Sequence, residues 1–175
     1  MTTVIQTNRS ALLLHELDDD TFDLVQTCVN AVDTELNVTH EIQMCGTSDT
    51  SITPSKPVHP CLRELLLYIN DKFDYRYNGI LINKCEGGDD YIGKQSDYER
   101  GLDAQADVIA ISCGAVRKFR VRHKSTGVIA MDVPTHPRHL IQMVGDFQKE
   151  FTHEFPVEKK VKGVRWSLTF RRHLE

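Results

Sequence analysis

A small set of residues in the second half of the chain has the types and the spacing that could bind a metal ion. Gln95 and Asp97 lie two residues apart, and His153 follows far downstream. Alternate residues of a strand point to the same face, so positions 95 and 97 can reach one ion together, with a third ligand from a neighbouring strand. Iron(II) sites of the facial-triad type use two histidines and one carboxylate, and they leave positions open for oxygen chemistry. The chain supplies two of these three ligands and an amide in place of the third.

The composition is typical of a soluble globular protein. The chain has 175 residues, 40% of them apolar and 26% charged, which is enough to bury a core and predicts one domain over residues 1–175. No apolar run approaches the roughly 20 residues that a transmembrane helix needs. The N-terminus lacks the basic and then apolar pattern of a signal peptide. We therefore expect a cytoplasmic or nuclear protein that does not contact a membrane.

Five cysteines, at positions 28, 45, 61, 85 and 113, form no C-x-x-C pair. This spacing excludes a zinc ribbon and a thioredoxin-like redox motif. Because intracellular compartments are reducing, we expect free thiols.

The net charge of −4 is unevenly distributed along the chain. Residues 1–116 contain 8 Lys or Arg and 19 Asp or Glu, whereas residues 117–175 contain 13 and 6. Such asymmetry is typical of a face that binds a polyanion, and the basic segments 117–124 and 159–162 can follow a phosphate backbone. The alternative is that one fold interleaves both halves, so that their fields cancel, and that the lysines of 159–162 lie in a solvated turn.

Two segments have the apolar spacing of helices. Asp20 has the position of an N-cap before a helix over residues 21–34. Pro60 suits the first turn of a second helix. Residues 46–60 are rich in Ser, Thr and Pro and predict a loop. The apolar residues of the two helices are Phe22, Val25, Val29 and Val32 in the first, and Leu62, Leu65, Leu66 and Ile69 in the second.

From about residue 75 the pattern changes to short strands separated by turns. Phe119 and Val121 alternate with Arg120 and Arg122, as in a half-buried strand. Two helices followed by many short strands indicate an α+β fold whose main body is a β-sandwich or jelly roll. The predicted strands are Tyr77–Asn83, Val108–Ser112, Lys118–His123, Val128–Asp132, His139–Val144 and Val164–Phe170.

Several longer sequence motifs occur in order along the second part of the chain. Together they resemble the AlkB family of nucleic-acid dealkylating dioxygenases over residues 60–173. The most specific features are the closing R-x-x-L-T-F-R motif and its distance from His153. The motifs are Leu81–Cys85, Tyr91–Glu99, Ile109–Ala115, Arg117–Lys124, Thr152–Pro156 and Arg165–Arg171.

The resemblance implies a fold and a cofactor set. The fold would be a double-stranded β-helix, or jelly roll, with two N-terminal helices packed on one sheet. Residues 1–59 would form an N-terminal helix and a short lid, and residues 60–175 a helix and the jelly-roll core. The protein would use iron(II), with 2-oxoglutarate as co-substrate.

The resemblance also implies roles for individual residues. A planar guanidinium pairs a carboxylate through two parallel hydrogen bonds, which suits two of the arginines to the dicarboxylate co-substrate. The implied residues are Asp97 and His153 for iron, Asn83, Arg165, Ser167 and Arg171 for 2-oxoglutarate, and Glu99 for the damaged base.

Gln95 stands where the family has its first histidine ligand. A glutamine carbonyl oxygen can ligate a metal, but it is neutral, harder and less suited to iron(II) than imidazole. We therefore expect weakened iron binding. The glutamine is either natural or a substitution made to trap an inactive complex, and the sequence is compatible with both.

Two further departures concern the co-substrate and the lid. Cys85 replaces a tyrosine that relatives place two residues after the asparagine, and because a thiol is a poorer donor than a phenol, we expect lower affinity for 2-oxoglutarate. The stretch Met44–Pro57 is short where cellular relatives have strand-contacting hairpins. A reduced lid favours single-stranded substrates, in which no base has to be pulled out of a duplex.

The sequence therefore predicts a monomeric enzyme that oxidatively demethylates N-methylated nucleobases in single-stranded DNA or RNA. The N-methyl group would be hydroxylated and leave as formaldehyde, while 2-oxoglutarate becomes succinate and carbon dioxide. The alternative is a catalytically inactive AlkB-like module that binds nucleic acid without iron. Hydroxylation of a protein side chain is a third interpretation, which the family resemblance disfavours.

Overall fold

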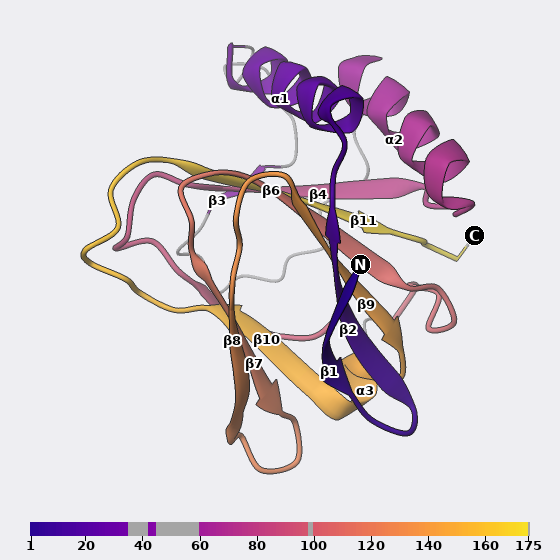
Figure 1. Ribbon diagram of the computed structural model, residues 1–175, viewed down its shortest axis with the longest axis vertical. Coiled ribbons are helices and arrows are strands. Elements are labelled where there is room, and N and C mark those ends of the chain that lie inside the picture. Colours follow the sequence, from indigo (N-terminus) through magenta and orange to yellow (C-terminus); the bar gives the residue numbers. More distant parts are fainter. Residues whose placement is uncertain (35–41, 45–59, 98–99, 175) are drawn as a thin grey trace.

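Two β-sheets and two longer helices make up the computed structural model, which describes residues 1–34, 42–44, 60–97 and 100–174 (Figure 1). Within these residues the larger sheet has seven strands in the order β1-β2-β9-β6-β11-β4-β3, and the smaller has four in the order β5-β10-β7-β8. The strands are β1 (Thr2–Gln6), β2 (Ser10–Glu16), β3 (Ile42–Met44), β4 (Gly79–Cys85), β5 (Ile92–Gln95), β6 (Val108–Gly114), β7 (Lys118–His123), β8 (Ile129–Pro134), β9 (His139–Gly145), β10 (Phe151–Phe155) and β11 (Arg165–Arg171).

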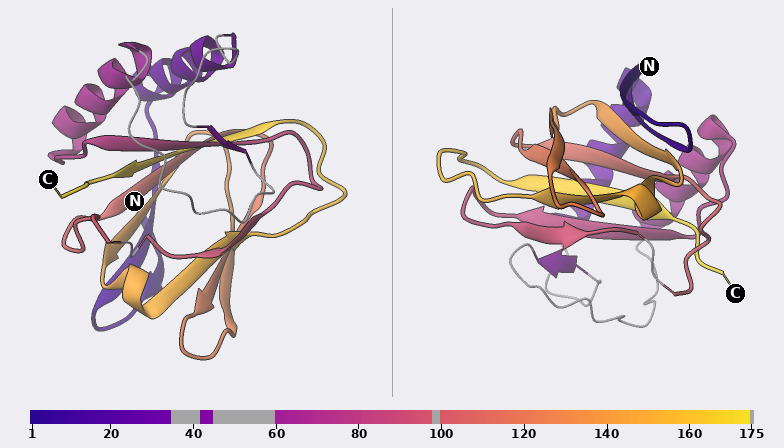
Figure 2. Two further views of the ribbon diagram at one scale, coloured as in Figure 1. Left: turned by 180° about the vertical axis from the view of Figure 1, so that it is seen from behind. Right: turned by 90° about the horizontal axis from the view of Figure 1, so that it is seen from below.

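From β4 onward the chain crosses repeatedly between the two sheets. β4, β6, β9 and β11 belong to the larger sheet, and β5, the β7–β8 pair and β10 follow them in turn in the smaller one. Nearly all of the strand pairs are antiparallel, although β3 runs parallel to β4. The smaller sheet lies opposite the larger one (Figure 2). This arrangement is compatible with the predicted β-sandwich or jelly-roll body.

The helices α1 (Asp19–Thr34) and α2 (Pro60–Phe73) lie side by side over the outer face of the larger sheet (Figure 1). Asp18 caps α1, because its Oδ1 accepts a hydrogen bond from the backbone N–H of Thr21 at 2.9 Å. The helix therefore begins before residue 21, and the prediction of Asp20 as the N-cap is wrong. Pro60 is the first residue of α2, as predicted.

The N-terminal segment differs from the prediction. The strands β1 and β2, which were not predicted, precede α1 and extend the larger sheet beyond β9. Among the described residues only α1 is an N-terminal helix, since α2 follows β3 in the chain, and the prediction of two N-terminal helices is not confirmed. None of the helices in the described ranges has the length and hydrophobicity needed to cross a membrane.

Two hydrophobic cores lie on the two faces of the larger sheet. An outer core joins this sheet to α1 and α2, and an inner core fills the space between the two sheets. β11 contributes to both sides, because residues of a strand alternate between its faces. Trp166, Leu168 and Phe170 pack in the outer core. On the opposite face, Arg165 lies against Phe155 of the inner core, so the inward side of β11 carries polar residues.

A disulfide joins the two long helices. Cys28 of α1 and Cys61 of α2 are bonded, with their Cα atoms 5.4 Å apart. Cys85 is also disulfide-bonded. Cys113 is buried and is a free cysteine. The prediction of free thiols is therefore wrong for Cys28, Cys61 and Cys85.

Candidate active site

Strands β5 and β10 place the predicted metal ligands beside one another. The two strands are antiparallel, and Gln95, the last residue of β5, is the register partner of His153 in β10. Asp97 follows β5 by two residues, and its Oδ2 lies 3.5 Å from Nε2 of His153. The pairing of β5 with β10 thus brings His153 beside Gln95 and Asp97, which are distant from it in sequence.

The environment of His153 favours a neutral imidazole. The side chain is buried, and its ring stacks on Phe119 with the ring centroids 5.2 Å apart. Burial lowers the pKa of His153, and this effect outweighs the opposing influence of the Asp97 charge. Neutral imidazole is the form that binds metal ions. His153 is therefore in the protonation state that a ligand needs.

Asp97 is held from two sides. The guanidinium of Arg171, at the end of β11, forms an ion pair with Oδ1 of Asp97. On the other side, the backbone N–H of Asp97 donates to Oε1 of Gln148 at 2.7 Å. Oδ2 is buried and has no hydrogen-bond partner among the described residues. One carboxylate oxygen is thus committed to an arginine, and the other is available on the side of His153.

Arg165 is a buried cation with no counter-ion in hydrogen-bonding contact among the described residues. Its side chain is almost fully buried at the start of β11, and its guanidinium lies 3.8 Å from the centroid of the Phe155 ring. Nη2 donates to Oγ of Ser112 at 2.9 Å, but Nε and Nη1 have no partner within the described part of the chain. Burial lowers the pKa of Arg165 to about 9, which still leaves the group charged at neutral pH. A buried, unpaired guanidinium of this kind fits a carboxylate ligand.

The other predicted co-substrate residues lie on the strands around Arg165. Ser167 of β11 is the register partner of both Asn83 in β4 and Ser112 in β6, and all three are buried. Because Ser167 is two residues from Arg165, both face the inside of the sandwich. These small polar side chains give the inner face of the larger sheet hydrogen-bonding groups next to the cation.

Arg117, the first residue of the basic segment 117–124, does not have the predicted role of contacting a phosphate backbone. Arg117 is buried and donates to the carbonyl oxygens of Gly87, Asp90 and Pro156 at 2.8–3.0 Å. It also pairs with Glu158 at 3.0 Å. Arg117 therefore joins the β4–β5 and β10–β11 loops and is not exposed to a phosphate backbone.

The next two arginines of the segment are paired on the outer face of the smaller sheet. Arg120 bonds Asp132, and Arg122 bonds Glu154, each at 2.8 Å. Acidic residues from other strands thus neutralise part of the positive excess. Both acidic partners belong to residues 117–175, so these two pairs do not join the unlike halves of the sequence. Arg171 pairs with Asp97 and Arg172 with Asp103, which agrees with the alternative that the fold interleaves the two halves.

Glu99, the predicted contact to the damaged base, lies outside the described residues. So do all but Pro60 of the loop predicted over residues 46–60 and all but Met44 of the lid stretch Met44–Pro57. Two polar residues that the sequence interpretation missed belong to the site. Ser112 bonds Arg165, and Gln148 bonds the backbone of Asp97. Neither residue type is specific enough to have been selected from the sequence, since only the strand pairing and a short helix bring them there.

The donor set fits the co-substrate better than it fits the metal. No group of three or more His, Cys, Asp or Glu side chains suited to a metal ion occurs in the portion of the chain that the structure describes. Asp97 and His153 supply two donors, and an amide oxygen from Gln95 has to complete the set. These residues fit an iron(II) site of reduced strength, whereas the unpaired atoms of Arg165 fit a carboxylate directly.

Comparisons with known proteins point to one group of enzymes. No protein-family model matches the chain. The chain is 32% identical over 134 residues to DNA oxidative demethylase ALKBH2 of Homo sapiens, which covers 73% of this chain and 51% of that protein. It is 31% identical to the protein of the same name from Bos taurus, over 73% of this chain and 48% of that protein. It is also 29% identical over 132 residues to alpha-ketoglutarate-dependent dioxygenase alkB homolog 3 of Homo sapiens, over 71% and 46% of the two chains. The chain spans about half the length of these relatives.

Proposed function

Because this chain belongs to the AlkB family of 2-oxoglutarate-dependent dioxygenases, we propose that it oxidatively demethylates N-methylated nucleobases in DNA or RNA. The observation that carries the proposal is Arg165, a buried cation with two nitrogen atoms that have no partner among the described residues. It lies over the ring of Phe155, two residues from His153 on β10. Leaving such a charge unpaired is costly, so its presence is best explained by an anionic ligand. We also propose that the two sheets form the double-stranded β-helix of this family.

In the proposed enzyme Asp97 and His153 hold iron(II), with Gln95 in the third position. When bound, iron(II) supplies the activation of oxygen that no amino-acid side chain can provide. The protein contributes the geometry. The Arg171 ion pair fixes the Asp97 carboxylate, and the Phe119 ring fixes the plane of His153. The hydrophobic residues of the inner core exclude water from the same space.

Arg165 binds a carboxylate of 2-oxoglutarate in this proposal. Asn83 and Ser167 provide further hydrogen-bonding groups beside it, and Arg171 contributes positive charge near the metal ligands. Because the guanidinium is already desolvated and fixed against Phe155 and Ser112, little rotational freedom is lost when the co-substrate binds. The co-substrate is converted into succinate and carbon dioxide while the N-methyl group is hydroxylated and leaves as formaldehyde.

We propose methylated single-stranded DNA or RNA as the substrate, with Glu99 against the modified base. The support is the similarity to a DNA oxidative demethylase, together with the shortness of the stretch Met44–Pro57, which favours bases that are already unpaired. The proposal includes a monomeric protein that acts inside the cell.

A second candidate function is a catalytically inactive module that binds nucleic acid. One observation favours it, namely that Gln95 leaves only two strong metal donors in the described site. This candidate predicts no iron uptake and a salt-sensitive affinity for nucleic acid that does not depend on methylation.

The two candidates are separated by an assay of the protein and its Gln95→His variant. Each is supplied with iron(II), 2-oxoglutarate and an oligonucleotide that carries one N-methylated base, and succinate and formaldehyde are measured. The enzyme hypothesis expects slow turnover by the parent and faster turnover by the variant. If the variant forms neither product, with each common N-methylated base in turn, the enzyme hypothesis is rejected and the binding module is favoured.

A further inference from the structure

The short helix α3 (Phe147–Glu150) directly precedes the strand that carries His153, and its Gln148 bonds the segment that carries Asp97. We propose that Gln148 of this helix is a positioning residue, which sets the place of Asp97 relative to His153. The inference rests on the proposed function, in which these two residues bind the metal. It assigns a role to a residue that touches neither of the proposed ligand side chains.

The first observation is a buried hydrogen bond across the site. Oε1 of Gln148 accepts from the backbone N–H of Asp97 at 2.7 Å. Gln148 is only 9% exposed and Asp97 only 7%. The other end of the amide is also fixed, because Nε2 of Gln148 contacts Sδ of Met143 at 3.2 Å. An N–H left unpaired in such a buried place costs about 1–3 kcal/mol, so the bond selects one backbone position for Asp97.

A second bridge runs in parallel with the first. Nζ of Lys124 donates to Oγ of Ser96 at 3.1 Å and to the backbone oxygen of Gln148 at 3.1 Å. Ser96 is the residue between Gln95 and Asp97. The segment that follows β5 is thus tied to α3 at two successive residues, once through the Gln148 side chain and once through Lys124.

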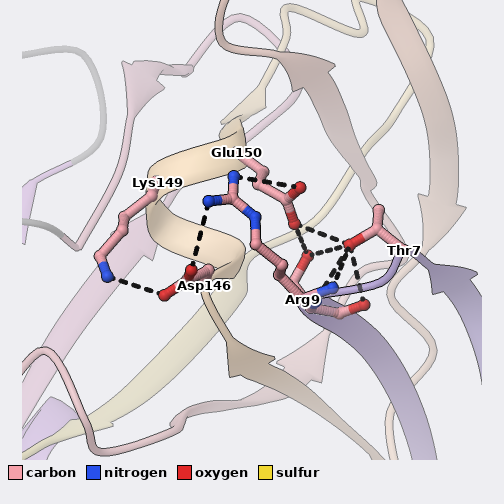
Figure 3. A network of polar contacts seen from close by, with 6 residues as sticks. Thr7, Arg9, Asp146, Lys149 and Glu150 are labelled. Carbon is pink, nitrogen blue, oxygen red and sulfur yellow. Dashed lines mark hydrogen bonds and ion pairs between the residues drawn. The ribbon is translucent and has the colours of Figure 1, made fainter.

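The helix α3 is itself anchored at both ends, so it can hold the Asp97 backbone in a fixed position. Phe147 and Phe151 are fully buried on either side of it, with their ring centroids 5.0 Å apart. Glu150 reaches the turn between β1 and β2, where its Oε2 accepts from Thr7 at 2.7 Å and from Ser10 (Figure 3). Arg9 of the same turn pairs with Asp146 and Glu150.

The anchored helix continues directly into β10, which begins at Phe151 and carries His153. Asp97 is therefore held in place by the same rigid element that positions His153. Partners that orient metal ligands typically contribute 10–100-fold to metal affinity. With the weak donor Gln95 in the third position, the spacing of the other two donors matters more, and Gln148 fixes it.

The test compares two buried glutamines. Gln148→Met removes the acceptor at nearly constant volume, and Gln148→Glu keeps an acceptor oxygen in the same place. Gln142→Met is the matched control, because Gln142 is also 9% exposed and bonded to Asp107 at 2.8 Å, but it has no contact with Asp97. Manganese(II) affinity is measured by the paramagnetic resonance of the free ion, in the parent and in the Gln95→His background. Protection of the Asp97 amide from hydrogen exchange is measured on the metal-free proteins.

We expect Gln148→Met to weaken manganese(II) binding about 10–100-fold and to expose the Asp97 amide, with Gln148→Glu restoring most of both. Gln142→Met lowers thermal stability but changes neither readout. Equal losses of metal affinity in the two Met variants, or an Asp97 amide that stays protected in Gln148→Met, would overturn the inference. If neither the parent nor the Gln95→His protein binds manganese(II), the proposed function fails, and the exchange of the Asp97 amide alone decides whether Gln148 positions that residue.

Discussion

Gln95 and His153 are register partners on two antiparallel strands, so the amide at the predicted first ligand position lies directly beside the predicted histidine ligand. The pairing fixes the backbone of position 95 independently of its side chain. Under the proposed function, glutamine in place of a histidine ligand is a change of donor atom within an intact frame, which a single substitution would reverse.

The first prediction follows from that frame. Gln95→His restores two imidazoles and one carboxylate, and we expect the metal affinity to rise at least about tenfold and the turnover of 2-oxoglutarate to rise with it. Manganese(II) titration and succinate release measure the two effects. Gln95→Ala is the control, and it should bind metal no better than the parent. Equal affinities in the His variant and the parent would mean that position 95 does not face the ion.

The second prediction concerns the charge of Arg165. Arg165→Met removes a buried guanidinium with two unpaired nitrogens, so we expect the ligand-free protein to become more stable, by about 1–4 kcal/mol. Each kcal/mol raises the Tm of a chain of this size by about 2–4 °C. The same change should remove the increase in Tm that 2-oxoglutarate produces in the parent.

Thermal melts with and without 2-oxoglutarate test both halves of this prediction. Arg172→Met is the matched control, because Arg172 pairs with Asp103 at 3.4 Å outside the site. It should keep the response to 2-oxoglutarate. A lower Tm for ligand-free Arg165→Met would show that the contacts with Phe155 and Ser112 outweigh the cost of the buried charge.

Much of the fold was predictable because alternation and turn residues act locally. The predicted strand over 118–123 matches β7, and the strands predicted from 108 and 139 begin where β6 and β9 begin. β5 and β10 were absent from the strands predicted by the local pattern, although the ligand spacing had placed Gln95 and His153 on neighbouring strands. β5 has only four residues, two of them polar, and β10 places polar residues between Phe151 and Phe155. Their stability comes from pairing with each other and with β7, which a local pattern does not contain.

The sequence predicted several residues of the site, but it did not predict which side chains are in contact. The family resemblance pointed to Asp97, His153 and Arg165, and the structure places the first two 3.5 Å apart. Gln148 was not predictable, because a single glutamine in a polar segment has no distinctive spacing. Its role depends on a tertiary contact between residues 51 positions apart. The local periodicity of a sequence does not reveal long-range polar contacts of this type.

The third prediction concerns the carboxylate of Glu150, which accepts hydrogen bonds from Thr7 and Ser10 at the turn between β1 and β2. The hydrogen bond from Ser10 is the main cause that lowers the pKa of Glu150 below its ordinary value of 4.5, with Thr7 and Arg9 adding to it. Because the folded-state pKa is the lower one, this contribution to stability is complete above pH 4.5 and is lost as the pH falls through the folded-state value.

Glu150→Gln tests this pH dependence. We expect the free energy of unfolding at pH 7 to fall by about 1–3 kcal/mol, because charge-assisted hydrogen bonds to Ser10 and Thr7 become neutral ones. The difference between parent and variant should shrink as the pH is lowered below 4.5. Urea unfolding at pH 7 and pH 3.5 measures it, and a constant difference at both values would contradict the assignment.

The fourth prediction concerns the covalent link between α1 and α2. Replacing both Cys28 and Cys61 by alanine opens a loop with a sequence separation of 33, and we expect a loss of about 3–4 kcal/mol in unfolding free energy. Cys113→Ala, which removes a buried free thiol, should cost less. Urea unfolding under non-reducing conditions compares them. If the double variant were as stable as the Cys113→Ala protein, the disulfide would have no role in stability.

The alternation along β11 sets a limit on how this protein can change during evolution. Trp166, Leu168 and Phe170 face the helices, whereas Arg165 and Ser167 face the other sheet, and both neighbours of the strand are paired along its length. Point substitutions affect one side at a time. The loss or gain of a single codon within the strand would exchange the two sets, sending arginine into the helix interface and tryptophan into the space between the two sheets. Length variation in descendants of this gene is therefore expected in the turns on either side of β11 and not within it.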